Sequence, residues 1–146
     1  MKGPILDKAI EILDQIMQCE LAGVVRYTHY SLMIKGPNRM PLVEFMKAQA
    51  VESLTHAQAA GEILTGLDGH PSLGIAPVEE CHQHSVQAMI EESYEHEMRA
   101  LDLYKDLLAV VADKSVYLEE YARGMIGQEE LHTMELRKMR RDYTAE

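Results

Sequence analysis

The chain has 146 residues, of which 47% are apolar and 26% are charged, so it can bury a core and is too apolar to be disordered. Its 24 acidic residues outnumber its 14 basic ones, and the net charge of −10 argues against nucleic-acid binding, because phosphates would be repelled. The sequence has neither a signal peptide nor a membrane-length apolar run, and its two cysteines are typical of a reducing compartment. We therefore expect one cytoplasmic domain over residues 1–146, with no nucleic-acid or membrane partner.

Four segments with the spacing of amphipathic helices follow one another, at about residues 4–35, 41–65, 78–112 and 116–142. Apolar residues recur three and four positions apart in each segment, which is the period of one helix face. Pro4 and Pro41 stand at the first two helix starts, and Ser115 is the expected N-cap of the fourth helix. The pattern predicts an all-α antiparallel four-helix bundle, with a longer second connection of about ten residues.

Glutamate and histidine, residue types that can bind metal ions, interrupt the apolar stripes near the middle of each predicted helix. They are Glu20 in the first segment, Glu52 and His56 in the second, Glu97 in the third, and Glu129 and His132 in the fourth. Unpaired carboxylates are costly to bury, and few cations are expected in this core because Arg26 and Arg99 fall off the stripes. Two divalent metal ions would balance four carboxylates, and carboxylate with imidazole suits iron or manganese.

The two halves of the chain repeat part of this pattern. A glutamate is followed by a tyrosine seven positions later in two segments, as Glu20 with Tyr27 and Glu97 with Tyr104. Each of these glutamates is also followed by a histidine, His56 at 36 positions after Glu20 and His132 at 35 positions after Glu97. One Glu-x-x-His on a helix is usually a solvated face, but matched positions on four helices favour a metal site.

These residues resemble the ferritin-like di-iron carboxylate superfamily, and most closely the bacterioferritin family, over nearly the whole chain. The resemblance is carried by Met1-Lys2-Gly3, Glu20-Leu21-Ala22 with Tyr27, His56-Ala57, Glu97 with Ala100 and Tyr104, and Glu129-Glu130-Leu131-His132. It implies a ferritin-like bundle that binds two irons per chain, with manganese or zinc as alternatives. It makes Glu20 and Glu97 terminal ligands of separate irons and Glu129 a bridge between them. It makes His56 and His132 the imidazole ligands.

The sequence departs from the family pattern at three places. The family's second helix would carry a glutamate at position 53, where this chain has Ser53, and Glu52 is turned away from that direction by about 100°. A centre with Glu52 in its place is rearranged, reduced to one tight metal ion, or lost. The family's haem-ligand methionine is replaced by Leu54, so we expect no haem. The chain ends 14 residues after His132, without the family's fifth helix, so formation of the 24-subunit cage stays open.

Three functions stay open from the sequence. The leading hypothesis is a ferroxidase that oxidises Fe(II) with dioxygen through Glu20, Glu97 and Glu129, with iron storage as an addition. The second is a di-metal oxidase or peroxide-handling protein that stores no iron, and the third is a non-enzymatic bundle subunit with a degenerate site. By analogy with the family, we expect a homo-oligomer, either a dimer or a larger assembly.

Two further features contain histidines. The run Glu79-Glu80-Cys81-His82-Gln83-His84 could bind a transition metal at the surface, but we prefer to interpret it as the polar start of the third helix. His29 lies beside the first stripe, and we interpret it as an interface or core histidine.

Overall fold

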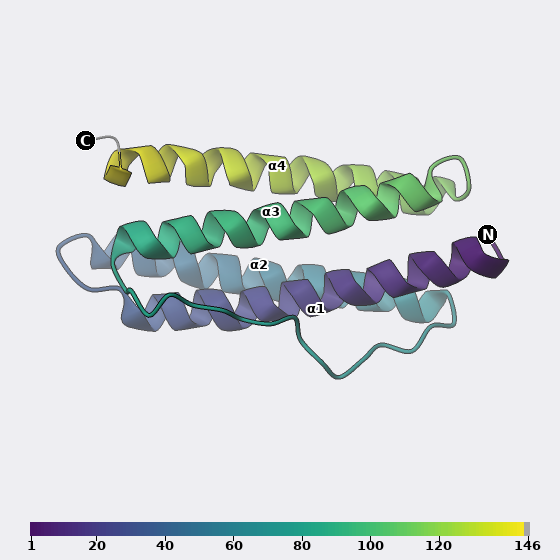
Figure 1. Cartoon of the computed structure of the whole chain (residues 1–146), viewed down its shortest axis with the longest axis horizontal. Coiled ribbons are helices and arrows are strands. Elements are labelled where there is room, and N and C mark those ends of the chain that lie inside the picture. The colour runs from purple at the N-terminus through teal and green to yellow at the C-terminus, as the bar shows by residue number, and fades with distance from the viewer. Residues whose placement is uncertain (145–146) are drawn as a thin grey trace.

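The computed structural model describes residues 1–144, and the side chains of residues 1–140. In this part of the chain, four helices are present and no strand: α1 (Gly3–Met33), α2 (Arg39–Gly66), α3 (Val86–Val111) and α4 (Val116–Thr144). Helix α1 packs against α2 and α3, and α3 packs against α4 (Figure 1). The prediction of an all-α four-helix bundle is confirmed. Within residues 1–144, no helix combines the length and the apolar character that a membrane span requires.

Proline and serine mark the helix starts. Pro4 lies in the first turn of α1, as expected. The Ser115 hydroxyl accepts a 3.2 Å hydrogen bond from the backbone N–H of Leu118, so the predicted N-cap of α4 is confirmed. The Ser85 hydroxyl accepts a 3.1 Å bond from the N–H of Ala88 and caps α3 in the same way.

The third helix begins at Val86, so the prediction that it begins near residue 78 is wrong. The run of residues 79–84 precedes α3 and does not open it. Within this run the backbone of His82 has a φ of 58°, in the left-handed region that interrupts a helix. The helix can start only after this residue, at the Ser85 cap. The connection between α2 and α3 therefore spans residues 67–85 and is longer than expected.

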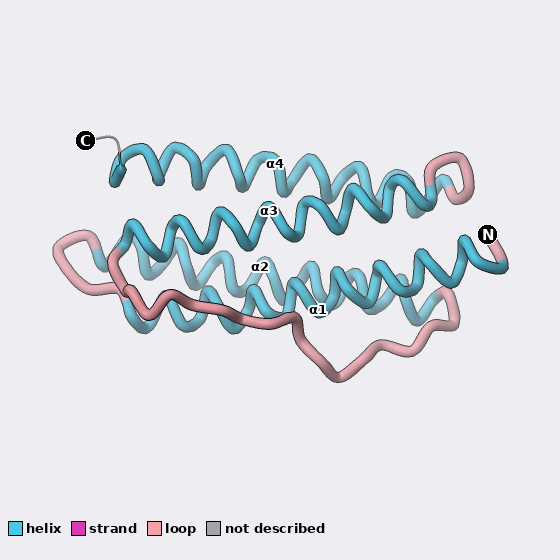
Figure 2. Tube along the Cα trace, viewed as in Figure 1, coloured by secondary structure: helices cyan, strands magenta, loops and turns pink. Residues whose placement is uncertain are grey.

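The length of the α2–α3 connection (residues 67–85) decides the direction of α3. The 28 residues of α2 extend for about 42 Å, whereas ten extended residues reach only about 35 Å. The longer connection returns along the whole bundle, so α3 runs in the same direction as α2 (Figures 1 and 2). The helix pairs with close backbone contacts, α1 with α2, α1 with α3, and α3 with α4, are all antiparallel (Figure 1).

The connection runs along the outer side of α1, where it is drawn in pink in Figure 2. The backbone N–H of Ser72 donates a 2.9 Å hydrogen bond to Asp14 Oδ1, and the N–H of Ala76 donates a 3.1 Å bond to the carbonyl of Gln18. These bonds hold an extended segment against one face of α1, although it forms no regular structure.

Two apolar clusters fill the bundle interior. One contains Leu13 and Leu107, and the other contains Tyr30 and Met46. The buried polar and charged side chains are Glu20, Arg26, Ser31, Ser53, His56, Ser93, His96, Glu97, Glu129 and Thr133. Most of the predicted metal-ligating residues are among them, so the polar centre is an interior feature of the bundle.

Candidate metal centre

Carboxylates and imidazoles from all four helices converge in the middle of the bundle. Glu20 of α1, Glu97 of α3 and Glu129 of α4 are buried. On α2, His56 Nδ1 lies 3.3 Å from Glu20 Oε2 and 3.9 Å from Glu129 Oε1. On α4, His132 Nδ1 lies 3.8 Å from Glu129 Oε2. Five of the six residues singled out from the sequence therefore form one cluster.

The cluster divides into two groups that share one residue. One ligand atom from each of Glu20, His56 and Glu129 lies within 4.8 Å of the others, and the same holds for Glu97, Glu129 and His132. Glu129 belongs to both groups, with Oε1 toward His56 and Oε2 toward His132. A carboxylate that offers one oxygen to each of two ligand groups is arranged as a bridge between paired metal ions.

Two buried tyrosines hold the outer glutamates of the pair. The Tyr27 hydroxyl donates a 2.6 Å hydrogen bond to Glu97 Oε1, and the Tyr104 hydroxyl donates a 2.7 Å bond to Glu20 Oε2. Burial and the neighbouring glutamate raise the pKa of each tyrosine well above its usual value, so both hydroxyls remain donors. The repeated Glu–Tyr spacing in the sequence thus becomes a crossed pair between α1 and α3.

Glu52 lies at the rim of the cluster and not in the core. The buried residue here is Ser53, 5% exposed, whereas the Glu52 side chain is 36% exposed. The expectation of a core-facing carboxylate on α2 is therefore wrong, because one position along a helix turns the side chain by about 100°. Glu52 Oε1 nevertheless lies 3.2 Å from His132 Nε2 and 3.7 Å from His56 Nε2.

The two imidazoles are therefore placed between two kinds of carboxylate. Each ring turns Nδ1 toward Glu129 and Nε2 toward Glu52. Among the residues whose side chains are described, neither converging group includes Glu52. An outer carboxylate that accepts the second N–H of a histidine fixes the tautomer and the orientation of the ring that faces a metal ion.

Burial and mutual repulsion raise the proton affinity of the cluster. Burial raises the pKa of Glu129 to about 7, and the charges of Glu20 and Glu52 act in the same direction, although a hydrogen bond with Glu97 opposes them. Burial, with the adjacent Glu129, raises the pKa of Glu97 well above its usual value. Without a metal ion, Glu97 and Glu129 therefore retain a proton between them at neutral pH.

The pKa of His56 is set by two opposing effects. Burial lowers the pKa of His56, but the hydrogen bond and the charge of Glu20 outweigh it and raise that pKa above the usual value.

Arg26 corrects one expectation about the core. The sequence places it off the apolar stripe, but its side chain is buried. Its guanidinium donates a 2.8 Å hydrogen bond to the Tyr30 hydroxyl and lies 3.8 Å from Glu92. The buried arginine thus has its own acidic and phenolic contacts, and the carboxylates of the cluster call for a different counter-charge.

Two atoms of the cluster show that a cation fits. Glu129 Oε2 and His132 Nδ1 are buried and, within the described part of the chain, have no hydrogen-bond partner. They face each other across 3.8 Å, which is too long for a hydrogen bond. Unpaired buried polar atoms are destabilising, and a metal ion bound by both would remove that penalty. The donor set of carboxylate oxygen and imidazole nitrogen suits iron, manganese or zinc.

His96 is a buried residue of this region that the sequence analysis missed. It is 2% exposed, and its ring packs edge-on against Tyr27 with ring centroids 5.9 Å apart. Burial lowers the pKa of His96 to about 3, so the ring is neutral. His96 lies three positions after Ser93 and four before Ala100, and this spacing was the available signal for an inward direction.

Gly23 and Ser53 leave space for the His96 ring. A Cβ atom added at Gly23 would lie 2.8 Å from His96 Nε2 and 2.9 Å from Ser53 Oγ. Three helices therefore approach one point beside the centre, and only a residue without a side chain fits there on α1.

The sequence matches the family model described as Ferritin-like domain over residues 10–144. The chain belongs to the ferritin-like domain family. Solved structures with this fold include the ferritin-like diiron-carboxylate proteins from Bacillus anthracis, at a TM-score of 0.90 and 21% identity over 95% of this chain and 99% of that chain. Bacterioferritin from Rhodobacter capsulatus has a TM-score of 0.85 and 23% identity over 98% and 88% of the two chains.

A third structure with this fold is the dodecameric thioferritin from Bacteroides fragilis. It has a TM-score of 0.88 and 18% identity over 96% of the ferritin-like chain and 88% of its own. A comparison with curated protein sequences gave no significant match. At these identities the structures establish the shared fold, and the predicted resemblance to the ferritin-like superfamily is confirmed.

Proposed function

We propose that this ferritin-like chain binds two metal ions in the bundle and oxidises Fe(II) with dioxygen, as a ferroxidase. The observation that carries the proposal is the placement of Glu129, which has one oxygen in each of two ligand groups. Glu20 and His56 would bind one ion, Glu97 and His132 would bind the other, and Glu129 would bind both.

Glu52 has a positioning role in this proposal. Its Oε1 lies 3.2 Å from His132 Nε2 and 3.7 Å from His56 Nε2, so it faces the ring nitrogens that point away from Glu129 and would leave the Nδ1 atoms for metal ions. Ser53 therefore removes one bridging carboxylate without removing an imidazole or the shared Glu129. The centre would have fewer anionic ligands than the family pattern and an outer carboxylate common to both rings.

Fe(II) is the substrate of the proposed reaction, and the electrons and protons balance simply. Two Fe(II) ions lose one electron each, and dioxygen gains two electrons and two protons to leave as hydrogen peroxide. A paired site keeps the two ions about 3.5–4 Å apart, close enough to react with one small molecule. The net charge of −10 raises the local concentration of Fe(II).

The side chains of the chain itself hold and release protons. The proton that Glu97 and Glu129 retain at neutral pH must leave when cations bind, because metal ligands bind in the ionised form. The Tyr27 and Tyr104 hydroxyls keep their protons and fix the orientation of the outer glutamates.

A specific observation favours one alternative. Ser53 occupies the position at which the family carries a bridging carboxylate, so a centre that binds metal without oxidising Fe(II) is the second candidate. A non-storing oxidase or peroxide-handling protein would use the same ligands as the ferroxidase.

Iron storage and homo-oligomerisation are further parts of the proposal. Light scattering separates a dimer from a dodecamer or a larger shell.

The deciding experiment is an anaerobic titration of Fe(II) into metal-free protein, followed by air and by measurement of ferric absorbance. We expect saturation at about two Fe(II) per chain. Oxidation should be fast in the wild type and abolished in Glu129→Ala. Glu95→Ala, at an exposed position of α3, is the matched control and should behave as the wild type. Oxidation no faster than in buffer would overturn the ferroxidase proposal, and tight Mn(II) binding in that protein would then support the second candidate.

A further inference from the structure

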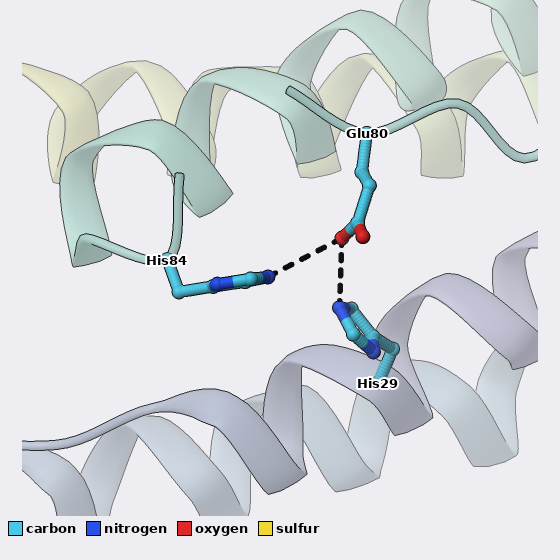
Figure 3. A group of neighbouring side chains, drawn as sticks. All are labelled: His29, Glu80 and His84. Carbon is cyan, nitrogen blue, oxygen red and sulfur yellow. Dashed lines mark hydrogen bonds and ion pairs between the residues drawn. The ribbon is translucent and has the colours of Figure 1, made fainter. Parts of the chain in front are cut away.

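A second group of metal-ligating side chains lies on the outer side of α1 (Figure 3). His29 comes from α1, and Glu80 and His84 come from the α2–α3 connection. Glu80 Oε2 lies 2.9 Å from His29 Nε2 and 3.4 Å from His84 Nε2. One ligand atom from each of the three residues lies within 4.8 Å of the others. The two imidazoles thus approach the same carboxylate from different segments.

This group is separate from the buried centre. His29 follows Glu20 by nine positions, which at 100° per residue is two and a half turns of α1. The two side chains therefore leave opposite faces of the helix, and their origins are about 13 Å apart along its axis. All three residues of the outer group are half-buried, whereas four of the five ligands of the centre are buried and only His132 is half-buried. His29 is half-buried against Glu80, so the interpretation of His29 as a core histidine is wrong, whereas its interpretation as an interface histidine stays a prediction.

The fold holds the outer group in place before any metal binds. The backbone N–H of Cys81, next to Glu80, donates a 2.8 Å hydrogen bond to Glu92 Oε2 on α3. The other oxygen of Glu92 accepts a 2.7 Å bond from the Tyr30 hydroxyl, next to His29. Glu80 and His29 are therefore chain neighbours of Cys81 and Tyr30, which Glu92 already joins through two hydrogen bonds. A ligand set that is ordered in advance loses less conformational entropy on binding.

The two oxygens of the Glu80 carboxylate face different rings, because Oε2 lies against His29 and His84 and Oε1 lies against His82. A third imidazole is also close, because His82 Nδ1 lies 3.1 Å from Glu80 Oε1, although that ring is 83% exposed.

We propose that His29, Glu80 and His84 bind one divalent transition-metal ion of the Zn(II) class. Two imidazoles and one carboxylate are the three protein ligands of many zinc sites that keep a fourth position for water. Mg²⁺ and Ca²⁺ prefer all-oxygen surroundings, so the two imidazoles select against them. His82 stands beside the site as an accessory ligand, since it reaches only the second oxygen of Glu80.

The same contacts have a simpler interpretation as hydrogen bonds that tie the α2–α3 connection to α1. The two interpretations differ in what Glu80→Gln does. The amide oxygen still accepts a hydrogen bond from an imidazole N–H, so a purely structural contact survives the substitution. A metal site loses its anionic ligand, so Zn(II) binding weakens strongly.

The test locates and counts Zn(II) in the full-length protein. We expect an anomalous difference peak, from crystals grown with Zn(II) and measured at the zinc edge, about 2.0–2.2 Å from His29 Nε2, His84 Nε2 and a Glu80 oxygen. In solution, the double variant His29→Ala/His84→Ala should bind one Zn(II) fewer per chain than the wild type. His70→Ala, at an exposed position in the same connection, should bind as many as the wild type.

The affinity measurements complete the test. Glu80→Gln should weaken Zn(II) binding by more than the roughly 10–100-fold that an outer contact of a metal site contributes. Circular dichroism of each variant confirms that the bundle is folded. No peak at this position, or equal Zn(II) stoichiometry in the wild type and the folded double variant, overturns the proposal. Loss of this site leaves Fe(II) oxidation at the buried centre unchanged, and Glu129→Ala leaves this site intact, so the two proposals fail independently.

Discussion

The hydroxyl of Tyr104 on α3 donates a 2.7 Å hydrogen bond across the bundle to Glu20 on α1. The reverse bond joins Tyr27 on α1 to Glu97 on α3, over 2.6 Å. Both tyrosines are fully buried. The crossed bonds connect the two outer glutamates of the centre to the helix that faces them, so each carboxylate is oriented before a cation arrives.

Removal of either hydroxyl should weaken the fold to a similar extent. Tyr27→Phe and Tyr104→Phe should each lower the free energy of unfolding by about 0.5–3 kcal/mol, because such a bond contributes least when the glutamate acceptor is protonated and most when it is ionised. Urea denaturation at pH 8 measures this change. Tyr117→Phe, at an exposed position, is the control and should change little. Equal stability of all three variants would contradict the proposed orienting bonds.

The stability of the metal-free protein should depend on pH through Glu129. Its pKa is about 7 in the folded chain and 4.5 in the unfolded chain, so the folded state binds the proton more tightly. Stability therefore falls as the pH rises from about 4.5 to 7, by about 3 kcal/mol, and the loss remains at higher pH. Relative to the wild type, Glu129→Gln should gain about this amount between pH 4.5 and pH 8.

Urea denaturation in the presence of a chelator measures this difference at the two pH values. Addition of Mn(II) at pH 8 should reverse it, because the metal stabilises only the chain that can bind it. A pH-independent difference between Glu129→Gln and the wild type would mean that Glu129 is not held in its neutral form.

His96 should make the fold sensitive to acid. The pKa of His96 is about 3 in the folded chain and 6.5 in the unfolded chain, so the unfolded state takes up a proton that the folded state does not. Its contribution is complete above pH 6.5 and is lost as the pH falls toward 3, by about 5 kcal/mol. His96→Leu should therefore unfold at a lower pH than the wild type in an acid titration followed by circular dichroism. His70→Leu, at an exposed position, should leave the acid midpoint in place.

Two glycine substitutions should have opposite effects. Gly23→Ala places a Cβ atom 2.8 Å from His96 Nε2, and the resulting overpacking of about 1–3 kcal/mol should exceed the helix-propensity gain of about 1 kcal/mol. Gly124→Ala on α4 meets nothing within 4 Å among the described residues, so it should stabilise the protein by about 0.5–1 kcal/mol. Thermal denaturation measures both changes. A stabilised Gly23→Ala would show that Ser53 and His96 move aside without difficulty.

Glu52 should affect metal affinity without affecting metal stoichiometry. Glu52→Ala removes the contact with both Nε2 atoms but leaves every converging ligand atom in place, so Mn(II) binding should weaken by about 10–100-fold at unchanged stoichiometry. Isothermal titration calorimetry separates the two quantities. Glu62→Ala, exposed on the same helix, is the control. A reduced stoichiometry would instead make Glu52 a ligand.

The sequence by itself determined the helices and most of the centre. Apolar spacing is a local property, so it predicts helices without knowledge of their neighbours. Pro4 and Ser115 act within one turn of their own helices, and both were predicted correctly. Glu20 and Glu129 were recognisable because a carboxylate within an apolar stripe has no local reason to be there.

The tertiary structure decided the features that depend on helix phase and on contacts distant in sequence. Which of Glu52 and Ser53 faces the core is a difference of one residue, and packing against the other helices sets it. The contact of His29 with Glu80 joins positions 51 residues apart. It forms because the α2–α3 connection returns along α1, and no local pattern contains that path. Periodicity specifies which residues share a helix face, whereas the packed bundle specifies what that face meets.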